Sequence, residues 1–366
     1  MKIVIIKETR RAENRVALTP QVAQQLIKVG HEIMLESQAG YASNFSDEAY
    51  EKVGCSVVDK SQALPLADIV VKVNAPDASE IALMKEGAAL ISYLYAAFNP
   101  ELVQQLNAKK LSAFGMDAIP RISRAQNMDA LSSQANLAGY KAVILGAANM
   151  GKIFPLLMTA AGTVTPARVL IYGAGVAGLQ AVATAKRLGA IVEVSDVRPE
   201  TKEQVESLGG KFIEVKSDEA AKVEGGYAKE VSAEYLAKQK EAVNKSLFMA
   251  DLVITTALVM GKKAPVLITE EQVKQMKLGS VIVDMAVEQG GNCELSEVDK
   301  TVTKHGVQII GIANLPATLP QNASELYAKN IQNLLNHLAT KDAFKWELEE
   351  EITKGTLICH DGRILR

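Results

Sequence analysis

Short apolar runs rich in Val and Ile recur along the chain, and stretches with the apolar period of a helix separate them. This alternation is typical of parallel sheets covered by helices. Strands are predicted in two series, the first at 2–8, 31–37, 68–74, 88–94 and 111–118, and the second at 168–175, 191–197, 211–215, 251–258, 280–286 and 307–313. The pattern therefore predicts an α/β fold with two Rossmann-like, doubly wound domains whose sheets are mainly parallel.

Long helices are predicted to join the two domains. Residues 128–155 combine good helix formers with an Asp or Ser start signal, so they can bridge the domains as one helix beside a hinge. Residues 315–340 become helical again and are predicted to return to the first domain. The acidic tail over 345–366 is predicted to form a terminal helix and a small hairpin.

The domain boundaries follow from these helices. With 366 residues the chain is long for a single hydrophobic core, so two domains of ordinary size are expected. The first, outer domain is predicted to comprise residues 1–130 and to be completed by residues 320–366. The second is predicted to comprise residues 131–319.

Composition and charge exclude several classes of protein. Apolar residues make up 48% of the chain and charged residues 22%, which suits packed cores rather than a disordered chain. The net charge is −2 and the basic residues are scattered among acids, so no nucleic-acid partner is expected. The three cysteines lie far apart, which favours neither a disulfide framework nor a metal site. No run approaches the roughly 20 apolar residues that span a bilayer, so direct membrane insertion is not expected.

A glycine pattern follows the first strand of the second domain. Gly173, Gly175 and Gly178 have the spacing G-x-G-x-x-G, directly after an apolar run and at the start of a helix that stops at Gly189. The first glycine permits a tight turn, the second lets backbone N–H groups approach a pyrophosphate, and the third lets helix and strand pack closely. The helix N-terminus adds partial positive charge. Because strand, glycines and helix are in register, the pattern predicts dinucleotide binding rather than a purely structural turn.

The next strand ends in Asp196, which is placed to accept hydrogen bonds from an adenosine ribose. A carboxylate there repels the 2′-phosphate of NADP(H), so NAD(H) is the predicted cofactor, although Arg198 two positions on argues for caution. The opening turn of the first domain, residues 7–20, contains no glycine, so one cofactor site per chain is predicted. A nucleotide at the carboxyl ends of the second set of strands would face the cleft between the domains.

Residues 120–143, PRISRAQNMDALSSQANLAGYKAV, form the most distinctive segment of the chain. This segment closely resembles the loop and following helix in the NAD(H)-binding domain of proton-translocating nicotinamide nucleotide transhydrogenases, which share their architecture with alanine dehydrogenases. The similarity extends over nearly the whole chain, since it also covers KIVIIKETRRAENRVALTP, VVKVNAP, GAGVAGLQA, EGGYAKEVS, DLVITTAL and SVIVDMAVEQGGNCE.

The resemblance implies a loop over the nicotinamide, formed by Arg121, Gln126, Asp129 and Ser132, with Gln126 near the contact with a partner's NADP(H). Arg121, Gln126 and Asp129 are therefore the candidate catalytic residues. Hydride transfer between two nicotinamides moves no proton at the reacting carbons, so the protein must position two rings and needs no general acid or base. From the sequence alone, Asp129 and Ser132 are equally expected merely to cap the following helix.

The same resemblance implies further contacts with the nucleotide. Gly226 and Tyr227 would belong to a mobile loop that closes the site, although the sequence alone equally favours an ordinary solvated connection. The remaining residues implied to line the pocket, beside the three glycines and Asp196, are Val176, Val197, Arg198, Gln239 and Leu258.

The activity implied by the resemblance is direct hydride transfer from NADH bound here to NADP⁺ bound on a β subunit, coupled to proton movement across the membrane. The chain ends at Arg366 without membrane helices, so the membrane segment is expected on a separate polypeptide, the second portion of a divided α subunit. A homodimer is expected on the same grounds. The implied location is the cytoplasm, peripheral to the inner membrane through these partner subunits.

Two alternatives stay open. An alanine dehydrogenase would need a lysine in a V-K-x-K-x-P-like strand and a histidine after a Y-L pair; Lys72 is present, but Tyr95 stands in place of the histidine. Tyrosine, with an ordinary pKa of about 10, is a poor acid-base group at neutral pH. The other alternative is a module that binds NAD(H) and catalyses nothing.

Overall fold

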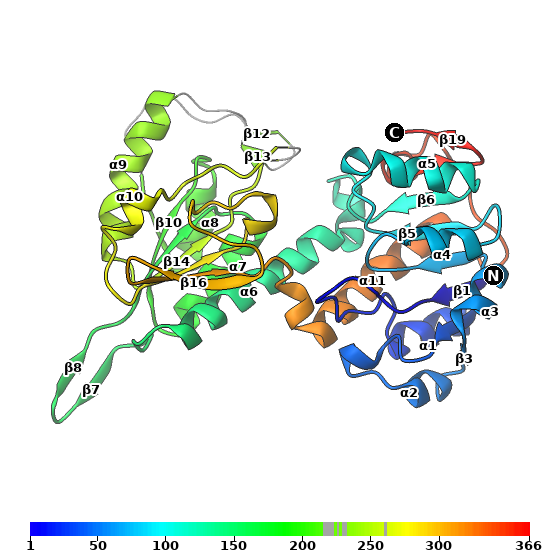
Figure 1. Ribbon diagram of the computed structural model, residues 1–366, viewed down its shortest axis with the longest axis horizontal. Coiled ribbons are helices and arrows are strands. Elements are labelled where there is room, and N and C mark those ends of the chain that lie inside the picture. The colour runs from blue at the N-terminus through cyan, green and yellow to red at the C-terminus, as the bar shows by residue number, and fades with distance from the viewer. Residues whose placement is uncertain (215–222, 225–226, 229–232, 260–261) are drawn as a thin grey trace. The chain divides into compact units, whose positions relative to one another are not determined.

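The computed structural model describes residues 1–214, 223–224, 227–228, 233–259 and 262–366. The chain divides into two compact units: unit 1 comprises Met1–Gln134 and Pro316–Arg366, and unit 2 comprises Ala135–Leu315. Each unit is built on a large, mostly parallel sheet, which confirms the predicted α/β fold class (Figure 1). The boundaries lie at 134/135 and 315/316, whereas the sequence placed them at 130/131 and 319/320.

Unit 1 contains an eight-stranded sheet in the order β3-β2-β1-β4-β5-β6-β18-β19. Its central strands carry almost no polar residues and are buried on both faces, as expected of a parallel sheet covered by helices. The strands are β1 (Lys2–Ile5), β2 (Glu32–Glu36), β3 (Ser56–Val58), β4 (Ile69–Val71), β5 (Ala89–Ser92), β6 (Ser112–Gly115), β18 (Leu357–His360) and β19 (Arg363–Ile364).

Helices and short 3₁₀ turns connect these strands. The α-helices are α1 (Pro20–Lys28), α2 (Asp47–Glu51), α3 (Lys60–Ala63), α4 (Ala78–Leu83), α5 (Pro100–Ala108), α11 (Pro320–Leu338) and α12 (Glu351–Thr356). The 3₁₀ turns are η1 (Tyr41–Ser43), η2 (Leu64–Leu66), η3 (Ala96–Phe98), η4 (Ser123–Met128) and η6 (Pro316–Thr318). As predicted, the helix after residue 315 belongs to unit 1, and the tail forms a helix and a hairpin, β18–β19, which pairs with β6.

Unit 2 contains a seven-stranded sheet in the order β11-β10-β9-β14-β15-β17-β16. Its strands are β9 (Arg168–Tyr172), β10 (Ile191–Ser195), β11 (Lys211–Phe212), β14 (Leu252–Thr255), β15 (Val281–Asp284), β16 (Lys300–Lys304) and β17 (Val307–Gly311). Its helices are α7 (Val176–Arg187), α8 (Thr201–Ser207), α9 (Ala233–Met249), α10 (Glu270–Val273) and the 3₁₀ turn η5 (Val287–Gln289). A further two-stranded pair is formed by β12 (Val223–Glu224) and β13 (Tyr227–Ala228).

The two sheets share one topology. Counted along the chain, the parallel strands of each unit lie in the order 3-2-1-4-5-6, the doubly wound arrangement that binds nucleotides where the order reverses. In unit 1 the reversal falls between β1 and β4, and in unit 2 between β9 and β14. The fold therefore directs attention to the carboxyl ends of these two pairs.

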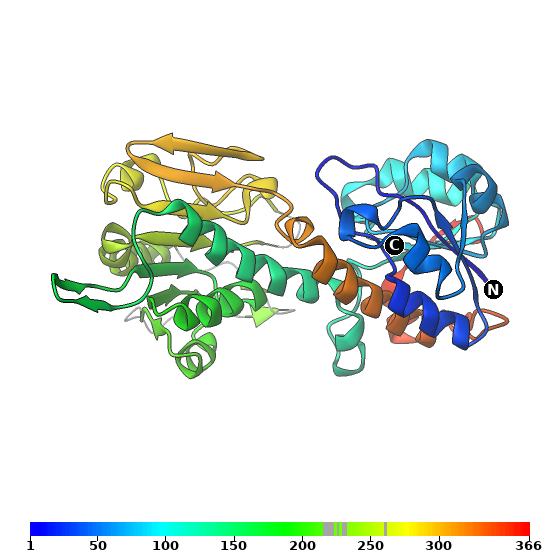
Figure 2. The same cartoon turned by 90° about the horizontal axis from the view of Figure 1, so that it is seen from below.

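The structure differs from the sequence prediction at a few elements. The connecting helix α6 (Ala130–Asn149) ends before residue 155, since Gly151 and Pro155 follow it closely. The chain then forms a hairpin, β7 (Leu157–Thr159) and β8 (Gly162–Val164), which extends away from the unit 2 sheet in both views (Figures 1 and 2). Strands β3 and β16 were also not predicted. No helix among the described residues combines the length and apolar character that a bilayer crossing requires.

A buried ion pair stabilises the centre of unit 1. Lys72, just after β4, lies 2.7 Å from a carboxylate oxygen of Glu80 in α4, and the two side chains are 1% and 0% exposed. The same carboxylate accepts the backbone N–H of Asp77 in a capping box. Each charge depends on the other, because an isolated charge buried in the core is strongly unfavourable.

Lys72→Met should lower the free energy of unfolding of unit 1 by about 3 kcal/mol, because Glu80 is left as an unpaired buried carboxylate. The double variant Lys72→Met/Glu80→Gln should regain most of this loss, since glutamine keeps the acceptor for the capping box. Urea unfolding at neutral pH measures both. Equal stability of the single and double variants would contradict the pairing.

Candidate functional site

The turn after β9 forms the candidate site in unit 2. Gly173 has a φ of +96°, and a Cβ atom there would lie 2.4 Å from Thr256 Oγ1. A Cβ atom on Gly178 would lie 1.8 Å from the carbonyl oxygen of Gly173. Both positions therefore require glycine, since the strand, the turn and the helix leave no room for a side chain.

Helix α7 begins directly after Gly175, its N-cap residue. Among the described residues, no side chain caps this helix end, and its first turn contains no acidic residue. A Cβ atom built on Gly175 would meet only Arg198, with a guanidinium nitrogen at 4.0 Å, so the space above the turn is open. Uncapped N–H groups and the partial positive charge of the helix suit an anionic group such as a pyrophosphate.

Asp196 lies at the end of β10 beside this turn and is 8% exposed. One carboxylate oxygen accepts the N–H of Ala174 at 2.6 Å, so the carboxylate holds the glycine turn itself. The other accepts the backbone N–H of Arg198 at 2.8 Å, and the Arg198 guanidinium donates to both oxygens at 2.9 and 2.8 Å. Arg198 is thus an ion-pair partner of Asp196, which the sequence did not indicate.

The end of β14 lies next to the turn, because Thr255 pairs with Tyr172. Thr256 follows and donates its hydroxyl to the carbonyl oxygens of Tyr172 at 3.0 Å and Gly173 at 3.3 Å. Leu258 follows in turn and is partly buried. Sequence analysis did not single out Thr256, for which the available signal was a polar residue directly after a buried strand.

The other predicted contacts of unit 2 are placed unevenly. Gln239 of α9 donates to the hydroxyl of Ser195, next to Asp196, at 3.2 Å. Val176 is 42% exposed at the start of α7, and Val197 is partly buried after β10. Gly226 lies outside the described residues, and Tyr227 is described only through the backbone of β13. The glycines, Val176, Asp196, Val197, Arg198 and Gln239 therefore gather at the carboxyl ends of β9 and β10.

The predicted loop of unit 1 comprises the 3₁₀ turn η4 and its flanks. Arg121 and Gln126 are exposed. Asp129 accepts the backbone N–H of Ser132 at 2.9 Å and its hydroxyl at 2.5 Å. These two residues cap the start of α6, which is the structural role that the sequence left open.

Helix α11 and the C-terminal tail hold this loop. Asn330 and Asn333, one turn apart on α11, both donate their amide groups to the carbonyl oxygen of Asn127, at 2.9 and 3.0 Å. Arg124 forms an ion pair with Glu350 at 2.8 Å. The backbone on both sides of Gln126 is therefore fixed although its side chain is exposed.

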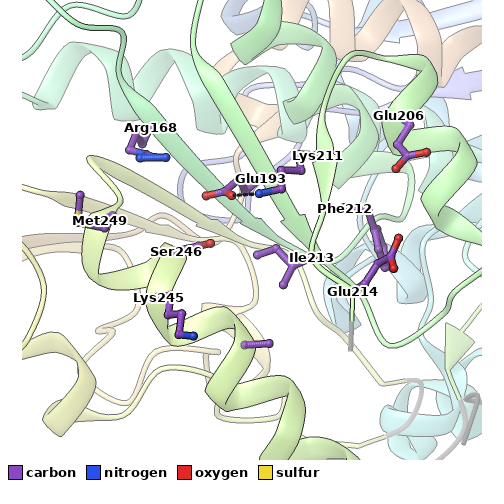
Figure 3. A pocket seen from close by; sticks show the side chains of 11 residues that line it. Arg168, Glu193, Glu206, Lys211, Phe212, Ile213, Glu214, Lys245, Ser246 and Met249 are labelled. Carbon is purple, nitrogen blue, oxygen red and sulfur yellow. Dashed lines mark hydrogen bonds and ion pairs between the residues drawn. The ribbon is translucent and has the colours of Figure 1, made fainter. Parts of the chain in front are cut away.

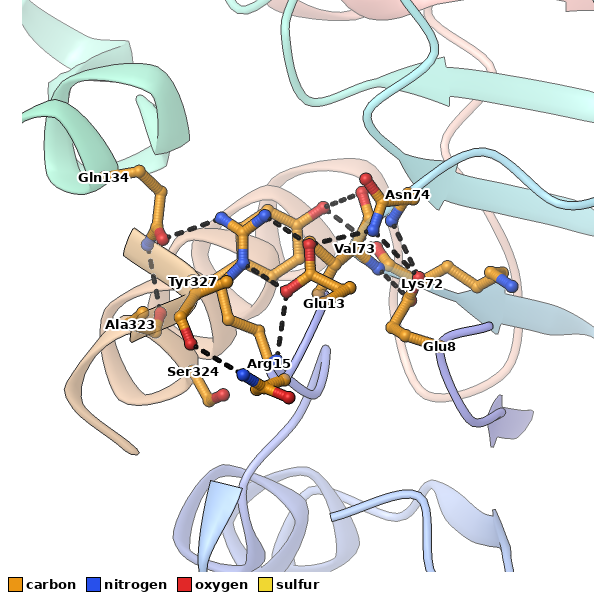
Figure 4. Close-up of polar contacts among 12 residues, drawn as sticks. Glu8, Glu13, Arg15, Lys72, Val73, Asn74, Gln134, Ala323, Ser324 and Tyr327 are labelled. Carbon is orange, nitrogen blue, oxygen red and sulfur yellow. Dashed lines mark hydrogen bonds and ion pairs between the residues drawn. The ribbon is translucent and has the colours of Figure 1, made fainter. Parts of the chain in front are cut away.

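The corresponding crevice of unit 1 is filled by the unit's own side chains. Glu8, which follows β1, accepts the N–H groups of Val73 at 2.7 Å and Asn74 at 3.2 Å. Burial raises the pKa of the Glu8 carboxyl above its ordinary value. Glu13 forms two hydrogen bonds of 2.7 Å with the Arg15 guanidinium and accepts a third from Asn74 (Figure 4). This crevice therefore offers no open cradle for a pyrophosphate.

A cavity of about 660 Å³ lies along the edge of the unit 2 sheet between β10, β11 and α9 (Figure 3). It reaches Arg168 and Lys211, which begin β9 and β11, and so extends toward the amino ends of the strands. Its charges are partly paired within the protein, since Lys211 contacts Glu193 at 3.3 Å. Nucleotides bind at the opposite, carboxyl ends in this topology.

Known families match both halves of the chain. The sequence model described as "Alanine dehydrogenase/PNT, N-terminal domain" matches residues 4–138, and that described as "Alanine dehydrogenase/PNT, C-terminal domain" matches residues 142–366. The chain belongs to the alanine dehydrogenase/PNT family.

Members of the alanine dehydrogenase/PNT family with two different names are similar to the chain. The first portion of the divided NAD(P) transhydrogenase subunit alpha of Rhodospirillum rubrum is 53% identical over 100% of this chain and 98% of its own length. The crystal structure of the transhydrogenase from Sinorhizobium meliloti is 42% identical, with a TM-score of 0.91 over 100% of both chains. Alanine dehydrogenase of Bacillus subtilis is 33% identical over 100% of this chain and 92% of its own length.

The resemblance to the transhydrogenases, stated from the sequence, is thus confirmed. The alanine dehydrogenase relative shows that the family alone does not fix the activity. The residues at the site must decide between the two.

Asn330→Asp should loosen the loop that carries Gln126, because a carboxylate oxygen would then face the carbonyl oxygen of Asn127 in place of an amide donor. Amide hydrogen exchange over residues 126–129 should accelerate about tenfold, which corresponds to roughly 1.4 kcal/mol. Asn336→Asp, at an exposed position of the same helix, adds the same charge and should leave this exchange unchanged. Equal exchange in both variants would exclude the clamp.

Proposed function

We propose that this chain is the NAD(H)-binding subunit of a proton-translocating nicotinamide nucleotide transhydrogenase. Its NADH would transfer a hydride directly to NADP⁺ held on a separate subunit. The observation that carries the proposal is an open glycine turn in unit 2 together with a filled crevice at the same topological position in unit 1. One chain then holds one dinucleotide and needs a second chain for the acceptor.

The residues of unit 2 fit NAD(H). The N–H groups at the start of α7 would bind the pyrophosphate above Gly175, where the structure leaves space. Asp196 would accept the ribose hydroxyls, for which its ion pair with Arg198 must share an oxygen or open. Because Arg198 is engaged by a carboxylate, its charge is not directed to a 2′-phosphate, which supports NAD(H) over NADP(H).

The residues of unit 1 would act on the nicotinamide end. The nicotinamide supplies the hydride, so the protein must orient the ring and exclude water. Exposed Arg121 and Gln126 would fix the carboxamide and ribose, with Gln126 nearest the partner's NADP(H). Asp129 and Ser132 would shape the end of the same loop through their hydrogen bonds. In unit 2, Gly226 and Tyr227 would close the site, while Val176, Val197, Gln239 and Leu258 would line it.

The partners follow from the same proposal. The similar protein of Rhodospirillum rubrum is named as the first portion of an alpha subunit, which implies that other polypeptides complete the enzyme. We place NADP(H) on a β subunit and the membrane segment on the second portion of the α subunit, where proton movement would occur. The chain would act as a homodimer in the cytoplasm, peripheral to the inner membrane through these partners.

The alanine dehydrogenase alternative is disfavoured by three positions in unit 1. Lys72 is 1% exposed and bound to Glu80, so it is not free to bind a substrate carboxylate. The second lysine of the V-K-x-K-x-P pattern is Asn74 in this chain, and its amide is bound to Glu8 and Glu13. Tyr95, in place of the histidine, is 45% exposed.

Mixing the protein with an NADP(H)-loaded partner subunit tests the proposal. Reduction of an NAD⁺ analogue by NADPH should require both proteins. Silence with every partner would favour a module that only binds NAD(H), whereas alanine-dependent formation of NADH by the protein alone would favour an alanine dehydrogenase.

Asp196→Ala should raise the Kd for NADH at least about tenfold, because hydrogen bonds to a charged group contribute roughly 1.5–3 kcal/mol each. Fluorescence titration with NADH measures this change. Glu193→Ala removes the same charge from the same strand, away from the turn, and should leave the Kd unchanged. A similar loss in both variants would indicate a long-range effect of charge instead of a contact.

Gln126→Asn should slow hydride transfer about tenfold or more while the Kd for NADH stays within about twofold, because withdrawing the amide by one methylene misplaces a positioning group. Single-turnover transfer to a partner-bound NADP⁺ measures the rate. Gln105→Asn, exposed on α5, is the matched control. If affinity and rate fall equally, Gln126 does not lie at the reaction interface.

A further inference from the structure

A buried carboxylate organises the end of β15 in unit 2. Asp284 is 0% exposed and, among the described residues, has no basic side-chain nitrogen within 4.0 Å. Its oxygens accept five hydrogen bonds, from Ala286 N, Asn292 N, Cys293 N, Thr255 Oγ1 and Ser296 Oγ at 3.0, 2.9, 3.0, 3.0 and 2.6 Å. These donors take the place of a cation and fold the loop over residues 286–296 back onto the strand.

A pair of glycines makes this loop possible. Gly290 and Gly291 have φ values of +101° and +79°, a backbone conformation that other residues rarely adopt. A Cβ atom on Gly291 would lie 2.9 Å from a carboxylate oxygen of Asp284. The segment QGGN therefore brings the N–H groups of the next two residues to the carboxylate.

The loop places the amide of Asn292 against the chain just beyond β14. Asn292 is 0% exposed. Its Oδ1 accepts the N–H of Ala257 at 3.0 Å, and its Nδ2 donates to the carbonyl oxygens of Ala257 at 2.9 Å and Pro265 at 2.8 Å. One side chain thus pairs with both backbone groups of Ala257, as a neighbouring strand would.

Ala257 lies between two residues of the candidate site. Thr256 bonds the carbonyl oxygens of Tyr172 and Gly173 at the glycine turn, and Leu258 is among the residues proposed to line the nucleotide pocket. A continuous set of hydrogen bonds therefore runs from Asp284 through Asn292 and Ala257 to the turn.

We infer that Asn292, held by Asp284, is a positioning residue for NADH: it fixes the backbone over residues 256–258, which forms one wall of the nucleotide site. The inference rests on the proposed function, since it assumes that NADH binds at the glycine turn. It assigns a role to the segment SVIVDMAVEQGGNCE, whose residues do not themselves need to touch the nucleotide.

Asn292→Asp tests this role with almost no change in size. The new carboxylate oxygen faces the carbonyl oxygens of Ala257 and Pro265, so the segment should move and the Kd for NADH should rise about tenfold or more. With the partner subunit, KM for NADH should rise while kcat at saturating NADH stays within about twofold. A general loss of folding would instead lower kcat in proportion to the active fraction.

Two further variants complete the test. Asn244→Asp makes the same change at a position that only accepts a hydrogen bond, from Gln272, and should bind NADH as the unaltered protein does. Ser296→Ala removes one donor to Asp284 and should weaken NADH binding by about two- to fivefold, so it decides the matter if Asn292→Asp does not fold.

Unchanged Kd values in Asn292→Asp and Ser296→Ala would overturn the inference. If the unaltered protein itself binds no NADH, the proposed function fails instead. Exchange of the Ala257 amide hydrogen then decides the clamp alone: acceleration in Asn292→Asp or Ser296→Ala, with none in Asn244→Asp, supports it, and unchanged exchange refutes it.

Discussion

The close contact between Gly178 and the carbonyl oxygen of Gly173 sets the geometry on which the rest of unit 2 depends. Because no side chain separates them, α7 starts directly at the end of β9 and presents its N–H groups at the carboxyl edge of the sheet. Two neighbouring strands hold the turn in place: Asp196 accepts the N–H of Ala174, and Thr256 bonds the Gly173 carbonyl. The site is therefore fixed by the ends of three strands before any ligand arrives.

The two units show how one topology supports different roles. Both sheets follow the same strand order, yet the first crevice of unit 1 is occupied by Glu8, Glu13 and Arg15, whereas that of unit 2 is open above Gly175. Buried charges in unit 1 are balanced within the unit, by ion pairs and by backbone donors. Unit 1 is thus free to contribute a polar loop instead of a second nucleotide site.

Local patterns predicted the central strands and the glycine turn, because a fully buried strand such as β14 or β15 reads as an apolar run. They did not predict β16, an exposed antiparallel edge strand with the polar sequence KTVTK, or the exposed hairpin β7–β8. Partners far apart in sequence were also invisible. The pairing of Asn292 with Ala257 and of Asn330 with Asn127 depends on loops and helices that meet only in the folded unit.

The central claim is that this protein holds NADH and passes its hydride straight to NADP⁺ on another subunit. A single turnover with NADH deuterated at the transferred position, in ordinary water with the NADP⁺-loaded partner, tests it most directly. The account predicts that all of the deuterium appears in NADPH and none in the solvent, and that omitting either protein abolishes the transfer. Deuterium released to water, or oxidation of NADH without the partner, would contradict it.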